Sequence, residues 1–213
     1  KFSKNYQAGA LSFEIISNGK KLISNSGYFP NKYNKLNKLS KSSALQSTLI
    51  VEDHSSCSFK KIEKFNFTIS EGLKIIKKNI IQEENYWKIS AAHDGYLKKF
   101  GLIHEREIEF YPEQKKFVGF DKISNKSLSK NTKFDIRFHL HPNTKVMKTQ
   151  DNRSILIELE DEGWKFTCNN FDINIDNSLY FGNKNSYKEN RNIFISGITN
   201  MPDQVIKWEI TKL

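Results

Sequence analysis

The sequence has few of the residues that cross-link or interrupt a chain: two cysteines, two methionines and four prolines among 213 residues. Cys57 and Cys168 stand far apart and form no Cys-x-x-Cys pair, which excludes a zinc ribbon and a dithiol redox centre. One disulfide and two buried free thiols are both compatible with this spacing. No run of 18 apolar residues occurs, so we expect no membrane-spanning segment.

Arginine is also scarce, with four residues, and this affects how the charge is interpreted. The net charge of +10 and the pI of about 9.4 favour an anionic partner. Nearly all of this charge is lysine, used together with asparagine and isoleucine as in chains encoded by genomes rich in A and T. The sequence has no RNP-like run, zinc finger or basic helix, so we expect no specific nucleic-acid binding. An acidic polysaccharide remains compatible with a basic surface.

Apolar and polar residues alternate along most of the chain, which is the period of a half-buried strand. A Ser17-Asn18-Gly19 turn is expected to join Leu11–Ile16 to Lys21–Ser24 as a hairpin. The other expected strands are Ser47–Val51, Phe65–Ser70, Leu73–Ile81, Tyr86–Ala92, His104–Tyr111, Lys116–Ile123, Phe134–His141, Ser154–Leu159, Trp164–Cys168, Phe171–Ile175, Asn192–Ser196 and Gln204–Thr211. Residues 72–85 are the best helix candidate, although their isoleucines also suit a strand.

These strands predict an all-β fold, a large antiparallel β-sandwich of the supersandwich kind with few or no helices. The longest expected loop is 30–46, and the turns are Glu113-Gln114, Asp161–Gly163 and Asn169-Asn170. Residues 124–133 and 183–191 are expected to form shorter polar loops. Neither a repeat nor a linker is evident, so we expect a single domain over residues 1–213. The chain starts at Lys1 rather than Met, which is typical of a domain taken from a longer protein.

Residues 134–142, Phe-Asp-Ile-Arg-Phe-His-Leu-His-Pro, are the stretch richest in candidate chemistry. In a strand, side chains alternate between faces, so Phe134, Ile136, Phe138 and Leu140 should share a buried apolar face. The opposite face would carry Asp135, Arg137, His139 and His141. This row is compatible with a solvated sheet face, with a wall that faces a substrate, or with a metal site that would need a third ligand.

A second group lies around the short connection between Gly95 and Gly101, where His93, Tyr96, His104 and Arg106 gather. A histidine and a tyrosine suit proton abstraction next to a carboxylate, in which one group takes a proton and another donates one. Stabilisation of the loop is an equally good interpretation. The three tryptophans fall within alternating strands and are expected in the core, namely Trp87, Trp164 and Trp208. We find no phosphate-binding glycine loop and no nucleophile elbow.

Several segments, in order, resemble the C-terminal β-sandwich domain of heparinase II/III-like proteins. They are Gln7-Ala8-Gly9-Ala10-Leu11-Ser12-Phe13-Glu14, Leu22-Ile23-Ser24-Asn25-Ser26-Gly27, Leu39-Ser40-Lys41-Ser42-Ser43-Ala44-Leu45-Gln46-Ser47-Thr48-Leu49, Gly95-Tyr96, His104-Glu105-Arg106, Arg137-Phe138-His139-Leu140-His141-Pro142 and Gly163-Trp164-Lys165-Phe166. The resemblance covers nearly the whole chain. It implies a bacterial carbon–oxygen lyase module that cleaves a uronic-acid-containing polysaccharide by β-elimination. Such enzymes normally carry an N-terminal α/α-toroid, which is absent here, so we expect little activity from this domain alone.

The resemblance also exposes departures at the positions of the family's metal and catalytic residues. Where the family commonly has His-x-His, this chain has Asn5 and Gln7; a metal-ligand Asp aligns with Asn25, and another His with Gln46. Amides bind zinc poorly but hydrogen-bond well. We therefore expect no metal and no other cofactor, and a hydrogen-bonded amide cluster in its place.

The leading hypothesis is the β-sandwich of a polysaccharide lyase, with an acidic polysaccharide and the missing toroid as its partners. Within it, His93, Tyr96, His139 and His141 are candidates for catalysis or positioning. Arg137 would pair with a substrate carboxylate through its planar fork, with Arg106 and His104 as further candidates for binding. The alternative is a non-catalytic carbohydrate-binding or architectural domain. The compartment stays open between the periplasm and the cytoplasm of a bacterium.

Overall fold

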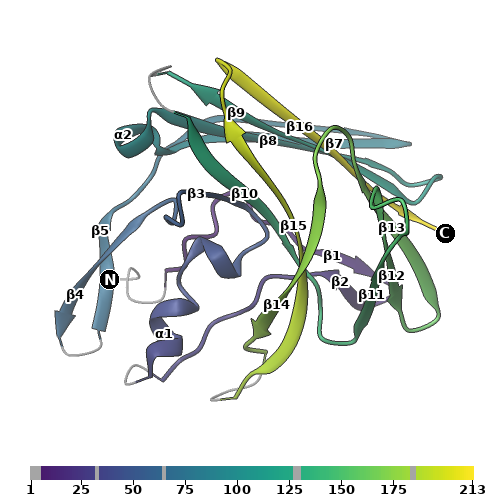
Figure 1. Cartoon of the computed structure of the whole chain (residues 1–213), viewed down its shortest axis with the longest axis horizontal. Coiled ribbons are helices and arrows are strands. Elements are labelled where there is room, and N and C mark those ends of the chain that lie inside the picture. Colours follow the sequence, from purple (N-terminus) through teal and green to yellow (C-terminus); the bar gives the residue numbers. More distant parts are fainter. Residues whose placement is uncertain (1–5, 32–33, 64–65, 127–130, 183–185) are drawn as a thin grey trace. The chain divides into compact units, whose positions relative to one another are not determined.

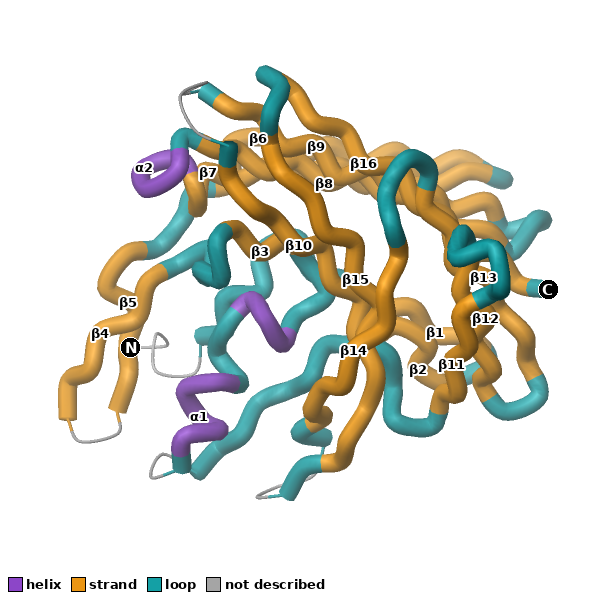
Figure 2. Tube along the Cα trace, in the orientation of Figure 1, coloured by secondary structure: helices purple, strands orange, loops and turns teal. Residues whose placement is uncertain are grey.

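The computed structural model describes residues 6–31, 34–63, 66–126, 131–182 and 186–213, and strands predominate in them (Figure 2). The strands are β1 (Ile15–Ser17), β2 (Lys20–Ile23), β3 (Leu49–Val51), β4 (Ser58–Glu63), β5 (Asn66–Glu71), β6 (Ile75–Glu83), β7 (Tyr86–Tyr96), β8 (Leu102–Tyr111), β9 (Lys116–Asn125), β10 (Thr132–His139), β11 (Thr144–Lys148), β12 (Ser154–Leu159), β13 (Glu162–Cys168), β14 (Ile173–Tyr180), β15 (Lys188–Thr199) and β16 (Asp203–Lys212). The short helices are α1 (Lys35–Leu39), η2 (Ser43–Leu45) and α2 (Leu97–Phe100). The predicted all-β, antiparallel fold class is confirmed.

The chain divides into two compact units, which are described separately. Unit 1 comprises residues 1–73, 135–142 and 175–194, and unit 2 comprises residues 74–134, 143–174 and 195–213. Strands β10 and β14 begin in unit 2 and end in unit 1, whereas β15 begins in unit 1 and ends in unit 2. These three strands belong to a four-stranded sheet of order β14-β15-β10-β3. The single domain over residues 1–213 stays a prediction.

Unit 2 contains an eight-stranded sheet in the order β11-β12-β13-β16-β9-β8-β7-β6; β6 is labelled in Figure 2 and the other strands in Figure 1. Its paired strands are antiparallel, and β8, β9 and β16 pair over almost their full lengths. Trp208 on β16 lies opposite Gly119 on β9, and its ring stacks on Phe166 of β13 with centroids 6.3 Å apart. These inward side chains form the core of the unit.

The expectation that all three tryptophans are buried is correct for Trp164 and Trp208 and wrong for Trp87. Trp87 is 48% exposed and meets Phe110 edge-on at 5.9 Å. It lies on β7, next to β6 at the edge of the sheet, where Ile80 and Ile89 are also exposed. Alternation identifies the two faces of a strand, but it does not say which face another layer covers.

Unit 1 contains the predicted hairpin, with Asn18 and Gly19 in the left-handed region that a tight turn requires. The expected 30–46 loop contains two short helices. Helix α1 begins at an N-cap, in which the Asn34 side chain accepts a hydrogen bond from the amide of Leu36. This cap, and not a helical spacing of apolar residues, sets the start of the helix. A small core of Phe29, Leu45 and Phe181 lies nearby.

Other expectations are settled by the described residues. The predicted apolar face of 134–142 is confirmed, since Phe134, Ile136, Phe138 and Leu140 are all buried. Residues 72–85 contain strand β6, so the strand alternative is correct there. Both cysteines are free thiols, and burial raises the pKa of Cys57 to about 11. No helix in the described part of the chain is long and apolar enough to cross a membrane.

Candidate functional site

A polar pocket of about 510 Å³ in unit 1 brings three of the predicted amides together. Its lining consists of Tyr6, Gln7, Gly9, Ser12, Glu14, Lys21, Asn25, Gly27, Gln46 and Tyr180, and we call it the amide pocket. Gln7 precedes the first strand, Asn25 follows β2, and Gln46 directly follows the short helix η2. The fourth predicted amide, Asn5, lies outside the described residues.

The amides are held by main-chain atoms rather than by one another. Gln7 Nε2 donates to the carbonyl oxygens of Gly27 and Ser40, both at 2.8 Å. Asn25 Oδ1 accepts from the Ser47 amide at 2.9 Å. Gln46 differs, because its Nε2 is buried and has no hydrogen-bond partner among the described residues. The three described amides therefore share one pocket, with one donor left unsatisfied, whereas the predicted hydrogen bonds between the amides are not among their contacts.

The charged groups of the amide pocket neutralise each other. Lys21 Nζ lies 2.8 Å from Glu14 Oε2. The hydrogen bond to Glu14 raises the pKa of Lys21, so the lysine stays protonated and paired. Glu14 also accepts the backbone amide of Asn25 at 3.2 Å, which ties the pair to the amides. The remaining polar side chains of the lining are uncharged amides and hydroxyls.

The residues present do not fit the metal that the family resemblance implies. Zinc takes imidazole, thiolate and carboxylate ligands. Gln7, Asn25 and Gln46 offer none of these, and two of them already hydrogen-bond to the main chain. No group of three His, Cys, Asp or Glu side chains placed to hold a metal ion occurs among the described residues.

The second predicted group forms a directed chain of hydrogen bonds inside unit 2. The Gly95 amide donates to His93 Nδ1 at 3.1 Å, so His93 carries its proton on Nε2. That proton is donated to His104 Nδ1 at 3.3 Å, and His104 Nε2 then donates to Asp121 Oδ1 at 2.6 Å. Both imidazoles are therefore neutral and fixed in one tautomer.

Asp121 is the acceptor at the end of this chain. Arg106 Nε and Nη2 donate to its two oxygens at 2.8 and 3.0 Å, and Trp208 Nε1 donates at 2.8 Å. Burial alone would raise the pKa of Asp121, but the Arg106 charge and these donors hold it well below its usual range. Burial, and to a smaller extent the neighbouring His104 and Arg106, lower the pKa of His93 to about 3.

This cluster is part of the core of unit 2. His93, His104, Arg106 and Asp121 are all at most 3% exposed, and Tyr96, whose ring centroid is 5.7 Å from that of His93, is buried as well. A polymer in solution cannot touch side chains so deeply buried. The catalytic roles of His93 and Tyr96 and the binding roles of His104 and Arg106 stay predictions, and the geometry favours a stabilising role.

The sequence analysis did not identify Asp121, and it placed Trp208 in the core without its hydrogen bond to Asp121, although a signal for Asp121 exists. The predicted Glu113-Gln114 turn sets the register of the β8–β9 hairpin, and this register places Arg106 opposite Asp121. Opposite charges directly across paired strands attract each other, so the turn and the arginine together identify the aspartate.

The row 135–141 is divided between packing and the amide pocket. His139 is buried; its Nε2 donates to the Ala44 carbonyl at 3.0 Å, and the Ser178 hydroxyl donates to its Nδ1 at 3.0 Å. Burial, mainly, lowers the pKa of His139 to about 3. His139 therefore links the segments around Ala44 and Ser178 by hydrogen bonds within unit 1.

Arg137 and His141 are half-buried. Arg137 Nη2 lies 3.3 Å from Asp135 Oδ2, and its guanidinium lies over the Phe194 ring at 5.4 Å. The ring of His141 packs edge-on against that of Tyr180, which lines the amide pocket, with centroids 5.1 Å apart. Burial and the charges of Lys21 and Lys188 lower the pKa of His141. Through its contact with Tyr180, His141 is the predicted catalytic residue nearest to the lining of the amide pocket.

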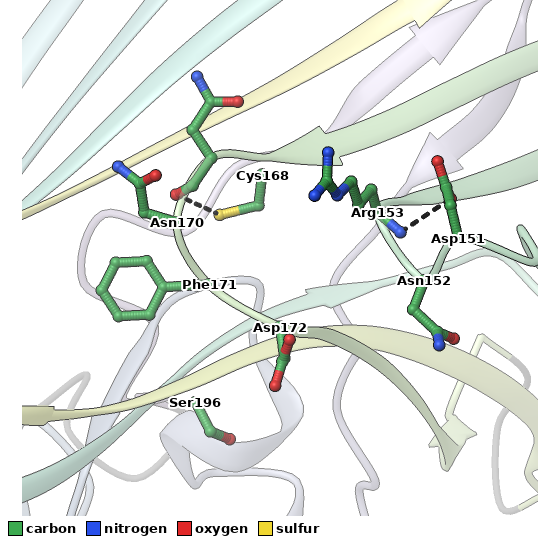
Figure 3. Close-up of a pocket in the computed structure, with 9 residues that line it drawn as sticks. Asp151, Asn152, Arg153, Cys168, Asn170, Phe171, Asp172 and Ser196 are labelled. Carbon is green, nitrogen blue, oxygen red and sulfur yellow. Dashed lines mark hydrogen bonds between the residues drawn. The ribbon is translucent and has the colours of Figure 1, made fainter.

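Unit 2 has a larger pocket, of about 770 Å³, that sequence reasoning did not identify. It lies among Asp151, Asn152, Arg153, Cys168, Asn169, Asn170, Phe171, Asp172 and Ser196 (Figure 3). Asp151 accepts from the Arg153 backbone amide at 3.0 Å, and the Cys168 thiol donates to the Asn169 carbonyl at 3.6 Å. The lining carries charges of both signs on exposed loops.

The fold is that of the C-terminal domains of bacterial heparinases. The structure is similar to heparan sulfate lyase HepC from Pedobacter heparinus, with a TM-score of 0.78 at 11% identity, and to the heparinase III BT4657 gene product, with 0.73 at 13%. In both cases 97% of this chain and 30% of the other are covered. At such identities the likeness is one of fold.

Family membership follows from the sequence match. The family model "Heparinase II/III-like, C-terminal" matches residues 1–209, and the chain belongs to this family. It is also 25% identical over 223 residues to FtsZ-localized protein C of Caulobacter vibrioides (strain NA1000 / CB15N). That match covers 99% of this chain and 38% of the relative, so the chain spans well under half of the proteins it resembles.

Proposed function

We propose that this domain binds a polysaccharide through the amide pocket and does not cleave it. The observation that carries the proposal is the chemistry of Gln7, Asn25 and Gln46. These three neutral amides line one pocket at the positions where the family resemblance implies metal ligands. A pocket rich in amides and hydroxyls, with aromatic rings at its wall, suits sugar hydroxyls.

β-Elimination needs a base for the proton next to the carboxylate and an acid for the leaving oxygen. Among the described residues that line the amide pocket there is no imidazole, and the one carboxylate, Glu14, is paired with Lys21. His93, His104 and Tyr96 are buried in unit 2, and His139 is buried in unit 1. These placements support binding over cleavage.

The relatives are compatible with either activity. One similar structure is titled a heparan sulfate lyase, whereas the curated relative is named for its localisation with FtsZ. One of these relatives is therefore not named for cleavage, although this chain spans only part of each.

The second candidate is the predicted lyase module, acting on an acidic polysaccharide together with an N-terminal toroid. The contact between His141 and Tyr180 favours it, because a neutral imidazole beside a phenol at the pocket wall resembles an acid–base pair.

One experiment separates the two candidates. The full-length gene product is mixed with a panel of neutral and acidic polysaccharides, and both binding and the ultraviolet absorbance of unsaturated uronate are recorded. We expect saturable binding without new absorbance, and binding weakened by Gln46→Leu. Absorbance that grows with time and disappears in His141→Ala would contradict the proposal and support the lyase. The exposed His54→Ala serves as the control for His141→Ala, since His54 lies outside both groups.

A further inference from the structure

Building on the proposed function, we infer that the amide pocket takes an uncharged sugar residue, which accepts a hydrogen bond from Gln46. This ligand differs from the acidic substrate that the +10 charge of the chain favours. One unsatisfied donor, the charge of the lining and two tyrosines support a neutral sugar.

Gln46 provides the unsatisfied donor. Its side chain lines the amide pocket, yet the residue is only 3% exposed and its Nε2 has no acceptor among the described residues. A buried amide donor without an acceptor is unfavourable, and such donors are rare in folded proteins. A sugar hydroxyl can supply the missing acceptor after a small rotation of the amide.

Gly9 packs closely against the side-chain amide of Gln46. A Cβ at position 9 would lie 3.0 Å from Ser12 Oγ and 3.1 Å from Gln46 Oε1, both closer than ordinary contact. A side chain at position 9 would therefore require Ser12 or the Gln46 amide to shift by a few tenths of an ångström. The glycine thus permits the close approach of residue 9 to this amide.

The charge of the lining favours a neutral ligand. Lys21 is the one cation of the described lining, and it already pairs with Glu14 at 2.8 Å. A carboxylate or sulfate ligand would have to compete with Glu14 for this one cation. A hydroxyl group of a neutral sugar requires no such exchange.

Two tyrosines supply apolar faces for a sugar ring. Tyr6 is 37% exposed, and Tyr180 is held by the edge-on contact with His141. Aromatic rings with a polar tip offer large contact areas while their hydroxyls stay available for hydrogen bonds. The lining thus combines aromatic surface with neutral donors and acceptors.

The test is a titration of the full-length protein with two sets of oligosaccharides by isothermal calorimetry, at low and at raised salt. The neutral set contains oligomers of glucose, xylose, mannose and N-acetylglucosamine; the acidic set contains heparan sulfate and alginate fragments. We expect a neutral oligomer to bind with little salt dependence. Gln46→Leu should weaken this binding about tenfold, the loss expected for one ligand hydrogen bond.

Three variants make the test specific. Gln46→Glu keeps the shape and removes the donor, so it should weaken binding of the neutral oligomer as Gln46→Leu does. Gly9→Ala displaces the same amide without altering it and should act in the same direction, which covers the case of a poorly folded Gln46 variant. Gln114→Leu, in an exposed turn of unit 2, is the matched control and should leave affinity unchanged.

The outcomes separate this inference from the proposed function. If acidic oligomers alone bind, and Gln46→Leu weakens them, the inference is overturned while the proposed function stands. If a neutral oligomer binds but both Gln46→Leu and Gly9→Ala are without effect, the role of Gln46 is overturned. If no oligosaccharide of either set binds, the proposed function fails and the inference fails with it.

Discussion

Asp121 is the residue on which the polar core of unit 2 depends. Its two oxygens accept from His104, from Arg106 twice and from Trp208, so a single carboxylate satisfies three buried side chains. Replacement of such a group costs more than the bonds it makes, because the buried guanidinium loses its counter-charge.

The variant Asp121→Asn should therefore lower the free energy of unfolding by about 3–5 kcal/mol. The amide has one carbonyl oxygen in place of two carboxylate oxygens, and its NH2 faces other donors. Urea denaturation at neutral pH measures the change. Asp203→Asn is the control, because Asp203 forms an exposed pair with Lys122 and its loss should cost no more than about 1 kcal/mol. Equal losses in the two variants would refute this account of Asp121.

At the scale of residues, the sequence predicts which types gather but not how deeply they lie. The structure brings His93, His104 and Arg106 together in unit 2, and Gln7, Asn25 and Gln46 line one pocket in unit 1. Burial was not predictable, because exposure depends on which layer covers a strand. A histidine at a strand position looks the same in a core as in an active site.

Gly119 on strand β9 allows the neighbouring strand β16 to pack the Trp208 ring against the backbone of β9. A glycine within a strand usually weakens it. Here a Cβ would lie 2.0 Å from Cζ2 of Trp208 on the neighbouring strand β16, so the ring occupies the space that a side chain would need. The same ring donates to Asp121, which couples the packing of the sheet to its polar core.

We expect Gly119→Ala to destabilise the protein by about 3 kcal/mol, although alanine is normally the better strand residue. The added methyl must displace the Trp208 ring, and the shift of this buried ring should change the intrinsic tryptophan fluorescence of the folded state. Chemical denaturation followed by fluorescence measures both effects. Gly72→Ala is the matched control, since the nearest atom to its Cβ is Ile69 Cγ2 at 3.9 Å. A Gly119 variant as stable as that control would contradict the packing argument.

At the scale of elements, the alternation of apolar and polar residues was sufficient to predict strands with one buried face. It missed β11, whose residues are at best half-buried and whose Met147 is largely exposed, because an edge strand has no clear apolar face. It also missed α1 and α2, of five and four residues, since helices this short are set by caps and by Gly101 in the left-handed region rather than by a period.

At the scale of the whole chain, buried neutral histidines occur in both units. His93 belongs to unit 2 and His139 to unit 1, and the pKa of each is lowered to about 3. All three tryptophans belong to unit 2, so their fluorescence reports on that unit, whereas circular dichroism reports on both. Three strands continue from one unit into the other, which favours cooperative unfolding.

Acid should therefore unfold the protein from both units at once. A histidine in the unfolded chain titrates near pH 6.5, so between pH 6.5 and about 3 the unfolded state binds more protons than the folded state. Each of the two residues should then remove about 1.4 kcal/mol of stability for each pH unit below 6.5, or about 2 kcal/mol each by pH 5. Asp121, whose folded pKa is lowered, adds a further loss below pH 4.

Urea titrations at pH 7, 6 and 5, followed by fluorescence and by circular dichroism, should give coincident transitions that shift together. His93→Gln should reduce the slope by about one proton. Stability that is flat between pH 7 and 5 would contradict the neutral, buried state of these histidines, and separate transitions would contradict the single-domain prediction.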